Sequence, residues 1–325
     1  MLESVVLLLL LQVPDLNAAD QLFQTGHVAE AQAQYQRLLQ QMPNEAGLLL
    51  RLGACEYQLG SFSAAADYFK RAANAQPDLP PALVGLGTSL VALGRFSEAL
   101  PPLEKAVKLA PSNRVTWRAL GHAYVESGEF LKGEEVLRRL VKEDPEDWES
   151  WFYLGTLLLN RHYDEPALRA LETSLKLRPS NVEAQIDRAS ALSELGRTED
   201  ADVQFQRLLR DPQLAKSPEL RLAYAQHLFQ NERYNEALHE IETAVRAAPN
   251  SAKVHFWKAR ILFHMDETNL AIPEAERAVE LAPELPNARS LLLRMYRLKG
   301  RDRDAALQAE WLAHNESKVA MGKGR

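Results

Sequence analysis

The chain has 325 residues, of which 46% are hydrophobic and 25% charged, proportions that exclude a disordered or fibrous protein and favour a folded soluble one. Its formal net charge of −6 does not favour a nucleic acid or another polyanion as a partner. The single cysteine, Cys55, excludes an intrachain disulfide, and its neighbours Gly53 and Ala54 predict a small buried side chain rather than a reactive thiol.

The chain begins with an apolar segment, residues 1–11, in which Val5–Leu11 is an unbroken apolar run. This run is far shorter than the roughly 20 residues that a membrane-spanning helix needs. One interpretation is the apolar region of a signal peptide, with cleavage near Ala18 and Ala19. The other is a first helix that packs on the repeats behind it, and the acidic Glu3 and the absence of an early Lys or Arg fit this second one. The sequence therefore leaves both a cytoplasmic and an exported location open.

From about residue 12 onward, the sequence repeats itself with a period of 34 residues. Prolines carry this period through most of the chain, at Pro43, Pro77, Pro111, Pro145 and Pro179, and then at Pro249 and Pro283. Pro249 follows Pro179 by 70 positions, which is two units and two extra residues. We place the extra residues in a loop at 211–217, which contains Pro212.

Small residues follow the same period at three further positions. One position holds Gly53, Gly87, Gly121 and Gly155, and the next, seven residues later, holds Gly26, Gly60, Gly94, Gly128, Gly196 and Gly300. The third holds Ala31, Ala65, Ala99, Ala167, Ala201, Ala237, Ala271 and Ala305, with Gly133 in the fourth unit. Small side chains at such positions allow paired helices to approach closely, and a larger one would push the backbones apart.

Each unit is predicted to form two helices. In the fourth unit one apolar face holds Trp117, Leu120, Gly121 and Tyr124, and after a turn at Gly128 a second face holds Phe130, Gly133, Leu137 and Leu140. Almost all other prolines fall in the first turn or so of a predicted helix, where the missing N–H costs little. The exception is Pro102, directly after Pro101, which we expect to displace or kink the start of its helix.

These motifs resemble the tetratricopeptide repeat. The resemblance is carried in the fourth unit by Trp117, Leu120, Gly121, Tyr124, Leu137 and Pro145, with Gly133 for the usual Ala, and the second and fifth units match similarly. It implies an all-α fold, a right-handed α-solenoid of about nine antiparallel helix pairs. The predicted units begin near residues 12, 46, 80, 114, 148, 182, 218, 252 and 286, the solenoid covers residues 12–317, and residues 318–325 form a basic tail.

Three units depart from the pattern. The first has Asp15 and Ala18 where large apolar residues are expected. The sixth has Gln185 and Arg188 at those positions, so the pairing of its first helix is in doubt. The ninth has no closing proline and is rich in arginine, including Arg294, which is typical of a solvated capping unit.

The resemblance implies that first helices line a concave groove that holds an extended peptide or a partner helix. The groove residues that we expect to bind a partner are Leu50, Tyr57, Val84, Arg118, His122, Phe152, Tyr153, Phe256, Trp257 and Arg260. Apolar and aromatic anchors with a few charges fit such a role. The alternative is that several of these rings pack between neighbouring repeats.

Two known uses of the family leave residue signatures that this sequence lacks. The Lys/Asn/Arg clamp of chaperone-binding members would require polar residues where the second to fourth repeats carry Leu50, Ala54, Arg51, Gly85 and Ala119. The asparagine ladder of members fused to a glycosyltransferase is replaced by Arg51, Gly85, Ala119, Tyr153, Asp187, Ala223 and Trp257. Neither ligand class is therefore expected.

The sequence also lacks the motifs of common catalytic, metal and phosphate sites, and its histidines are scattered over separate repeats. We expect no enzyme activity, cofactor or metal, and no nucleic acid partner. The predicted function is a non-enzymatic scaffold that binds a protein or peptide in its groove. The alternative is a structural subunit that assembles a larger complex through its convex face and its ends.

Overall fold

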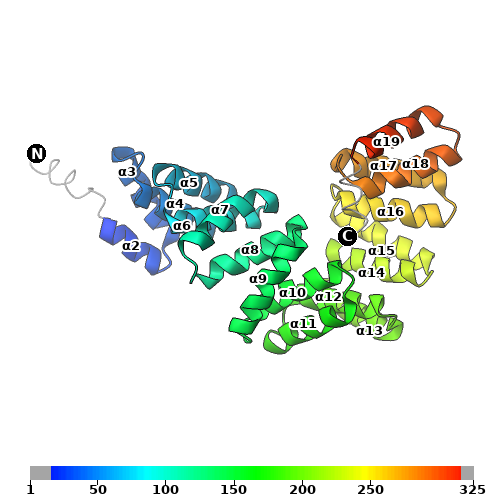
Figure 1. Cartoon of the computed structure of the whole chain (residues 1–325), viewed down its shortest axis with the longest axis horizontal. Coiled ribbons are helices and arrows are strands. Elements are labelled where there is room, and N and C mark those ends of the chain that lie inside the picture. Colours follow the sequence, from blue (N-terminus) through cyan, green and yellow to red (C-terminus); the bar gives the residue numbers. More distant parts are fainter. Residues whose placement is uncertain (1–15, 316–325) are drawn as a thin grey trace, which may run out of the picture. The chain divides into compact units, whose positions relative to one another are not determined.

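The computed structural model describes residues 16–315, and this part of the chain consists of 18 helices and no strands. The first helices of successive pairs are α2 (Leu16–Gln24), α4 (Ala46–Gln58), α6 (Pro80–Ala92), α8 (Arg114–Ser127), α10 (Trp148–Asn160), α12 (Val182–Glu194), α14 (Pro218–Gln230), α16 (Ala252–His264) and α18 (Pro286–Leu298). The second helices are α3 (Val28–Gln41), α5 (Phe62–Ala75), α7 (Phe96–Leu109), α9 (Phe130–Glu143), α11 (Asp164–Leu177), α13 (Thr198–Leu209), α15 (Tyr234–Ala247), α17 (Thr268–Leu281) and α19 (Asp302–His314). Figure 1 shows these helix hairpins following one another along the chain.

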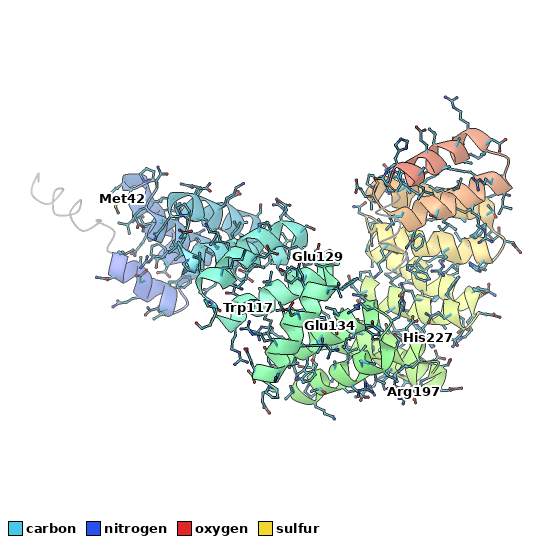
Figure 2. All side chains as sticks on the ribbon, in the orientation of Figure 1. Met42, Trp117, Glu129, Glu134, Arg197 and His227 are labelled. Carbon is cyan, nitrogen blue, oxygen red and sulfur yellow. The ribbon has the colours of Figure 1, made fainter. Side chains whose placement is uncertain are left out.

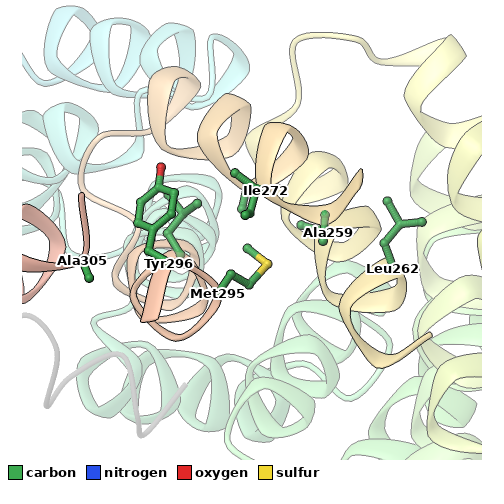
Figure 3. Packing of buried hydrophobic residues seen from close by; sticks show 9 residues of the cluster. Ala259, Leu262, Ile272, Met295, Tyr296 and Ala305 are labelled. Carbon is green, nitrogen blue, oxygen red and sulfur yellow. The ribbon is translucent and has the colours of Figure 1, made fainter. Parts of the chain in front are cut away.

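The chain divides into two compact units, with the boundary between Leu154 and Gly155 inside α10. Within each unit a helix packs on the helices that precede and follow it, as expected of a solenoid. In the second unit, Met295 and Tyr296 of α18 pack with Ile272 of α17 and with Ala259 and Leu262 of α16 (Figure 3). Each unit thus has a core that is continuous from one repeat to the next.

Every turn within a described helix pair has one residue in the left-handed region. Six of these residues are the glycines with φ between 65° and 84°, from Gly26 to Gly300. The other three turns carry His162, Glu232 and Asp266 at the same position of the repeat, with φ of 56°, 59° and 64°. The turn geometry is therefore kept even where the repeat lacks the glycine that adopts it without a steric cost.

The small residues of the repeat lie where two helices cross. The alanines of the third position are completely buried from Ala31 to Ala271, and Ala305 is 5% exposed. A Cβ atom at Gly87 would lie 2.4 Å from Cγ of Leu103, and one at Gly155 would lie 2.6 Å from Cγ of Leu171. Glycine at these first-helix positions therefore makes room for the large side chain of the second helix.

The adjacent prolines of the third repeat do not displace their helix. The helix α7 begins at Phe96, 34 residues after the start of α5 at Phe62, and it contains both Pro101 and Pro102. The expected shift of the helix start is thus absent. The two prolines are the sixth and seventh residues of α7, so each removes a backbone N–H that would have bonded to the carbonyl four residues earlier, yet the helix continues through them to Leu109.

A polar side chain ties the start of each first helix from α8 to α18 to the preceding loop. A side-chain N–H donates to the carbonyl oxygen six residues earlier, at distances of 2.6 to 2.9 Å. The donors are Trp117, Trp151, Gln185, Arg221, His255 and Arg289, and Figure 2 marks Trp117. For His255 the assignment requires the tautomer with a proton on Nε2.

This contact explains the irregular sixth repeat. Gln185 replaces the tryptophan of the two preceding repeats, yet its Nε2 donates to the carbonyl of Pro179 at 2.6 Å. Arg188 lies 3.5 Å from Glu172 of α11. Thus α12 packs between α11 and α13 like the other first helices, with polar contacts in place of apolar ones.

The terminal repeats also have specific contacts. In the first, Asp20 of α2 accepts hydrogen bonds from the hydroxyl of Tyr35 and from Arg51. In the ninth, Arg289 lies over the ring of Trp311, at 4.4 Å from the ring centroid. Cys55 is fully buried, and burial raises the pKa of its thiol to about 11. The proposed signal region in residues 1–11 and the basic tail at 318–325 lie outside the described residues.

Candidate functional site

The predicted groove residues of the second and third repeats do not form a cluster of their own. Leu50 is half-buried and packs against the core formed by Leu49, Ala72 and Ala82. Tyr57 is 38% exposed and meets the edge of Phe62, with ring centroids 5.2 Å apart. Val84 is half-buried. Leu50, Tyr57 and Val84 are therefore separate, partly exposed apolar side chains rather than one continuous surface.

In the first unit, three of the predicted residues lie together. The His122 ring of α8 stacks on the Tyr153 ring of α10, with centroids 4.2 Å apart and planes 15° apart. Phe152 lies beside Tyr153 at 5.1 Å, and Phe96 of α7 lies 5.5 Å from His122. We call these four residues the His122 cluster. Phe152 is only 8% exposed, so it packs mainly inside, whereas His122 and Tyr153 are half-buried.

Burial determines the protonation of this cluster. It lowers the pKa of His122 to about 4, because the surrounding rings replace the water that would solvate an imidazolium. His122 is therefore neutral near pH 7. The His122 cluster presents an aromatic face rather than a positive charge.

Arg118, also predicted to line the groove, has its charge offset. Its NH1 lies 2.9 Å from Asp147 and 2.6 Å from Glu149. Asp147 is nearly buried and also accepts from the hydroxyl of Ser150. Arg118 thus connects α8 to the start of α10, and this structural use is sufficient to explain it.

The second unit brings the other predicted residues into a larger group. The guanidinium of Arg260 on α16 lies over the ring of Trp257, at 4.5 Å from the centroid, and over the ring of Phe229 on α14, at 4.9 Å. His264 meets the Phe229 ring edge to face at 4.8 Å. Arg294 of α18 lies over the ring of Phe263, at 4.9 Å.

We call this group the Arg260 cluster. Its members are Phe229, Tyr234, Phe256, Trp257, Arg260, Phe263, His264 and Arg294. It contains all three predicted residues of the eighth repeat. Its rings come from α14, α15 and α16, and Arg294 comes from α18.

Arg260 differs from Arg118 in one respect that bears on binding. Within residues 16–315, no carboxylate, carbonyl or hydroxyl pairs with its guanidinium, which touches only aromatic rings. Burial lowers the pKa of Arg260, and no opposite charge counteracts this effect. The pKa of His264 is lowered by burial and by the charges of Arg260 and Arg294, so both guanidinium groups act on the same place.

Sequence reasoning missed part of the Arg260 cluster. Arg294 was assigned to a solvated cap, but it follows Arg260 by 34 residues and so occupies the same position of the next repeat. Phe229 and Phe263 are likewise 34 residues apart. These residues share equivalent positions in successive repeats, and this equivalence is the sequence signal that groups them.

A pocket lies between the first two repeats. It is lined by Asp20, Phe23, Gln24, Tyr35, Arg51 and Ala54. The Arg51 side chain donates to both carboxylate oxygens of Asp20, at 2.6 and 2.9 Å, and this contact lowers the pKa of Asp20. The charges of the pocket therefore satisfy each other.

A Ser–His–Asp chain lies in the second unit but does not have the form of an activated nucleophile. His227 of α14 (Figure 2) has its Nδ1 2.8 Å from the hydroxyl of Ser193 and its Nε2 3.5 Å from Asp202. Because the Ser193 hydroxyl donates to Gln230 at 2.7 Å, Nδ1 is the donor to serine, the reverse of what a general base needs. The contact between Nδ1 and Ser193 joins α14 to α12.

In the described part of the chain, no group of three or more His, Cys, Asp or Glu residues is arranged to hold a metal ion. None of the helices between residues 16 and 315 has the length and apolar character of a membrane span.

The fold and the helix-face clusters define an all-α helical-repeat solenoid. Comparison with family models identifies the repeat. Two models, both described as tetratricopeptide repeat, match residues 16–80 and 222–286 in one case and residues 90–158 in the other. Together they cover more than half of the chain, which belongs to the tetratricopeptide repeat family.

Solved structures agree on the fold. A tetratricopeptide repeat protein from Parabacteroides merdae matches with a TM-score of 0.64 and 19% identity, over 77% of this chain and 98% of that one. The Cut9–Hcn1 hetero-tetramer of the APC/C matches with a TM-score of 0.59 and 17% identity, over 86% and 54%. The human IFIT1 dimer with m7Gppp-AAAA matches with a TM-score of 0.59 and 18% identity, over 86% and 71%. A search of curated proteins found no match.

Proposed function

We propose that this chain is a non-enzymatic interaction scaffold that holds a peptide or protein segment against the faces of its first helices. The observation that carries the proposal is the gathering of partly exposed rings on α16 with two guanidinium groups, of α16 and α18, that form no ion pair. Tyrosine, tryptophan and arginine are the side chains that contribute most to protein interfaces. General support comes from the family, whose solenoid surfaces serve protein interaction.

The rings are suited to this role because they are fixed before a partner arrives. Tyr153 stacks on His122, and Trp257 is held between Phe256 and Phe229. Binding of a partner would therefore cost the scaffold side chains little conformational entropy. Such rigid apolar anchors bind best when the partner offers complementary side chains at regular spacing.

The test is capture of partners from the native host with the whole chain and with Tyr153→Ala and Trp257→Ala variants. We expect each substitution to weaken the capture of a specific partner about tenfold or more, with unchanged circular dichroism. Leu131→Ala and Leu270→Ala are the matched controls, since these side chains are 75% and 58% exposed on the second helices α9 and α17. Full capture by both groove variants would show that the groove is not the binding surface.

A second candidate is a structural subunit that assembles through second helices and chain ends. Its supporting observation is that α9, α13, α17 and α19 each expose a large apolar side chain, namely Leu131, Val203, Leu270 and Leu307. These side chains lie on separate repeats, which favours the groove proposal. Loss of capture in the Leu131→Ala and Leu270→Ala variants would reverse the order of the two candidates.

The expectation of no nucleic acid partner and no catalysis belongs to the same proposal. The human IFIT1 structure contains m7Gppp-AAAA, but at 18% identity this likeness concerns the fold. We expect no binding of a labelled RNA oligonucleotide to the whole chain at physiological salt, because the chain carries a net charge of −6.

A further inference from the structure

We propose that the Arg260 cluster is a carboxylate-binding site for an acidic, apolar-flanked peptide segment, with Arg260 and Arg294 as the anion-binding residues. This inference rests on the proposed function, since it names the partner chemistry of one part of the groove. It concerns the second unit alone, and within that unit the helices α14, α16 and α18, which pack in succession through contacts of α14 with α16 and of α16 with α18.

The first argument is the state of the Arg260 guanidinium. It is half-buried against Trp257 and Phe229, whose ring centroids lie 4.5 and 4.9 Å from its Cζ and whose planes are 79° apart. The neighbouring Ala259 and Leu262 are directed into the core, as Figure 3 shows, so Arg260 extends from another side of α16. Contact with aromatic rings does not satisfy the five N–H donors that lie in the plane of a guanidinium, and no acceptor within residues 16–315 bonds to those of Arg260.

The second argument is the contrast with other arginines of the described chain. Arg51, Arg118, Arg221 and Arg233 all lie on or beside first helices, and each forms an ion pair with an aspartate or glutamate. Among residues 16–315, Arg260 and Arg294 form no ion pair or hydrogen bond. Among the arginines of the described chain that form neither, Arg260 alone is half-buried, whereas Arg294 is exposed like the others.

The third argument is their repetition and convergence. Arg260 and Arg294 occupy the same position of the eighth and ninth repeats, so they lie on successive first helices. Both act on His264, whose pKa they lower together with burial. The rings that they lie over, Phe229 and Phe263, both contact His264, with centroids 4.8 and 6.3 Å away. Two guanidinium groups on one ring cluster form a positive site, and a planar carboxylate pairs well with such donors.

The surrounding rings specify what flanks the carboxylate. The half-buried rings of Trp257 and Phe263 lie against Arg260 and Arg294 respectively and offer apolar contact beside each guanidinium. An acidic side chain followed or preceded by leucine or phenylalanine would place its carboxylate on the arginines and its apolar neighbours on the rings. A nucleic acid would need a broader positive surface than two arginines on a chain of net charge −6.

The experiment measures fluorescence anisotropy of the whole chain with three labelled peptides. The peptides alternate leucine and phenylalanine with glutamate, with glutamine or with lysine, at otherwise identical sequence. We expect the glutamate peptide to bind about tenfold tighter than the glutamine peptide, and the lysine peptide to bind weakest. This preference should shrink as salt is added.

Variants then assign the site. Arg260→Gln and Arg294→Gln should each reduce the preference for glutamate over glutamine about tenfold or abolish it. Arg303→Gln is the matched control, because it removes the same charge from an exposed position of α19. Circular dichroism of each variant shows whether the fold is retained. If Arg260→Gln unfolds the chain, Arg260→Lys serves in its place, since it keeps the charge but loses the planar donors and should weaken the preference.

The outcomes separate this inference from the proposed function. Equal binding of the glutamate and glutamine peptides, lost in the Trp257→Ala variant, would keep the groove and overturn the carboxylate site. Equal loss of preference in Arg303→Gln and Arg260→Gln would also overturn it, because the effect would then be one of net charge. No binding of the glutamate peptide, or tighter binding of a labelled RNA oligonucleotide of equal charge, would contradict it as well.

Discussion

Single residues show how the repeat tolerates substitution without losing its geometry. The turn position keeps a left-handed backbone in every described pair, although three pairs lack glycine there. The first-helix donor keeps its hydrogen bond to the carbonyl six residues earlier through tryptophan, glutamine, arginine and histidine. What is retained at these positions is a backbone angle or a donor, not a residue type.

The turn position leads to a prediction on stability. Glu232 has a φ of 59°, which is sterically unfavourable for a residue with a side chain. Its side chain is exposed, so burial does not offset this strain. We expect Glu232→Gly to raise the free energy of unfolding by about 0.5–1 kcal/mol, because relief of strain exceeds the added entropy of the unfolded chain. Gly196→Ala, at the same repeat position, should lower it by about 1 kcal/mol. Urea unfolding of both variants measures this, and a loss of stability in Glu232→Gly would contradict it.

Burial of His122 leads to a prediction on pH. The pKa of His122 lies at about 4 in the folded chain and at its ordinary value near 6.5 when unfolded. Between these values the unfolded state binds more protons, so the stability contributed by this site is present above about pH 6.5 and is lost as the pH falls towards 4. The loss is at most about 1.4 kcal/mol for each pH unit.

The measurement compares thermal unfolding of the wild type and of His122→Phe from pH 7 to pH 4.5. Phenylalanine keeps a ring against Tyr153 and Phe96 but cannot take up a proton. We expect the variant to lose less stability on acidification than the wild type. His239→Gln, an exposed position on α15, is the control and should behave like the wild type. Parallel pH curves for His122→Phe and the wild type would refute the argument.

At the scale of elements, helix pairs are set by matched small and large side chains. Gly87 of α6 faces Leu103 of α7 so closely that a Cβ atom would lie 2.4 Å from Cγ of the leucine. Leu103 is itself completely buried. The close approach of α6 and α7 therefore requires a glycine on the first helix opposite the large leucine of the second helix.

This pairing predicts strong coupling in a double-mutant cycle. Gly87→Ala should destabilise the chain by about 1–3 kcal/mol through overpacking. Leu103→Ala should cost about 2–5 kcal/mol through the cavity that it leaves. The double variant should lose clearly less than the sum, because the added methyl group occupies part of that cavity. Urea unfolding provides the three values, and strict additivity would show that the two residues do not share one space.

At the scale of the whole molecule, stability is expected to be local. Helices pack mainly on their neighbours along the chain, and the contacts divide into two compact units. The loop between α13 and α14 holds the two extra residues of the repeat and consists of short turns. Repeat arrays of this kind unfold with partial independence of their ends.

Amide hydrogen exchange checks this expectation. We expect the weakest protection at residues 211–217 and in the terminal helices, and stronger protection in α6 to α8 and in α14 to α17. Local openings cost less free energy where fewer buried side chains are shared with a neighbour. A single sharp transition with uniform protection across residues 182–218 would contradict this.

The sequence alone determined the fold class and the family of this protein, because a 34-residue period in proline, glycine and alanine reflects contacts that every repeat makes with the next. Because these contacts join only neighbouring repeats, the same pattern of proline, glycine and alanine recurs along the chain. Sequence reasoning also named Trp257 and Arg260 as groove residues, and their binding role stays a proposal. It did not foresee that Gln185 keeps the hydrogen bond of the tryptophans.

Only the tertiary structure decided which arginines are neutralised. Arg118 and Arg260 are alike in the sequence as cations on first helices, yet Arg118 pairs with Asp147 and Glu149 while Arg260 lies between two rings. The Arg260 guanidinium contacts the ring of Trp257 on its own helix and that of Phe229 on the preceding first helix. Which contacts each arginine makes depends partly on side chains from neighbouring repeats, whose directions a period does not specify. Charge compensation acts over a few ångströms in space, and the distances between these side chains are fixed only when the helices pack.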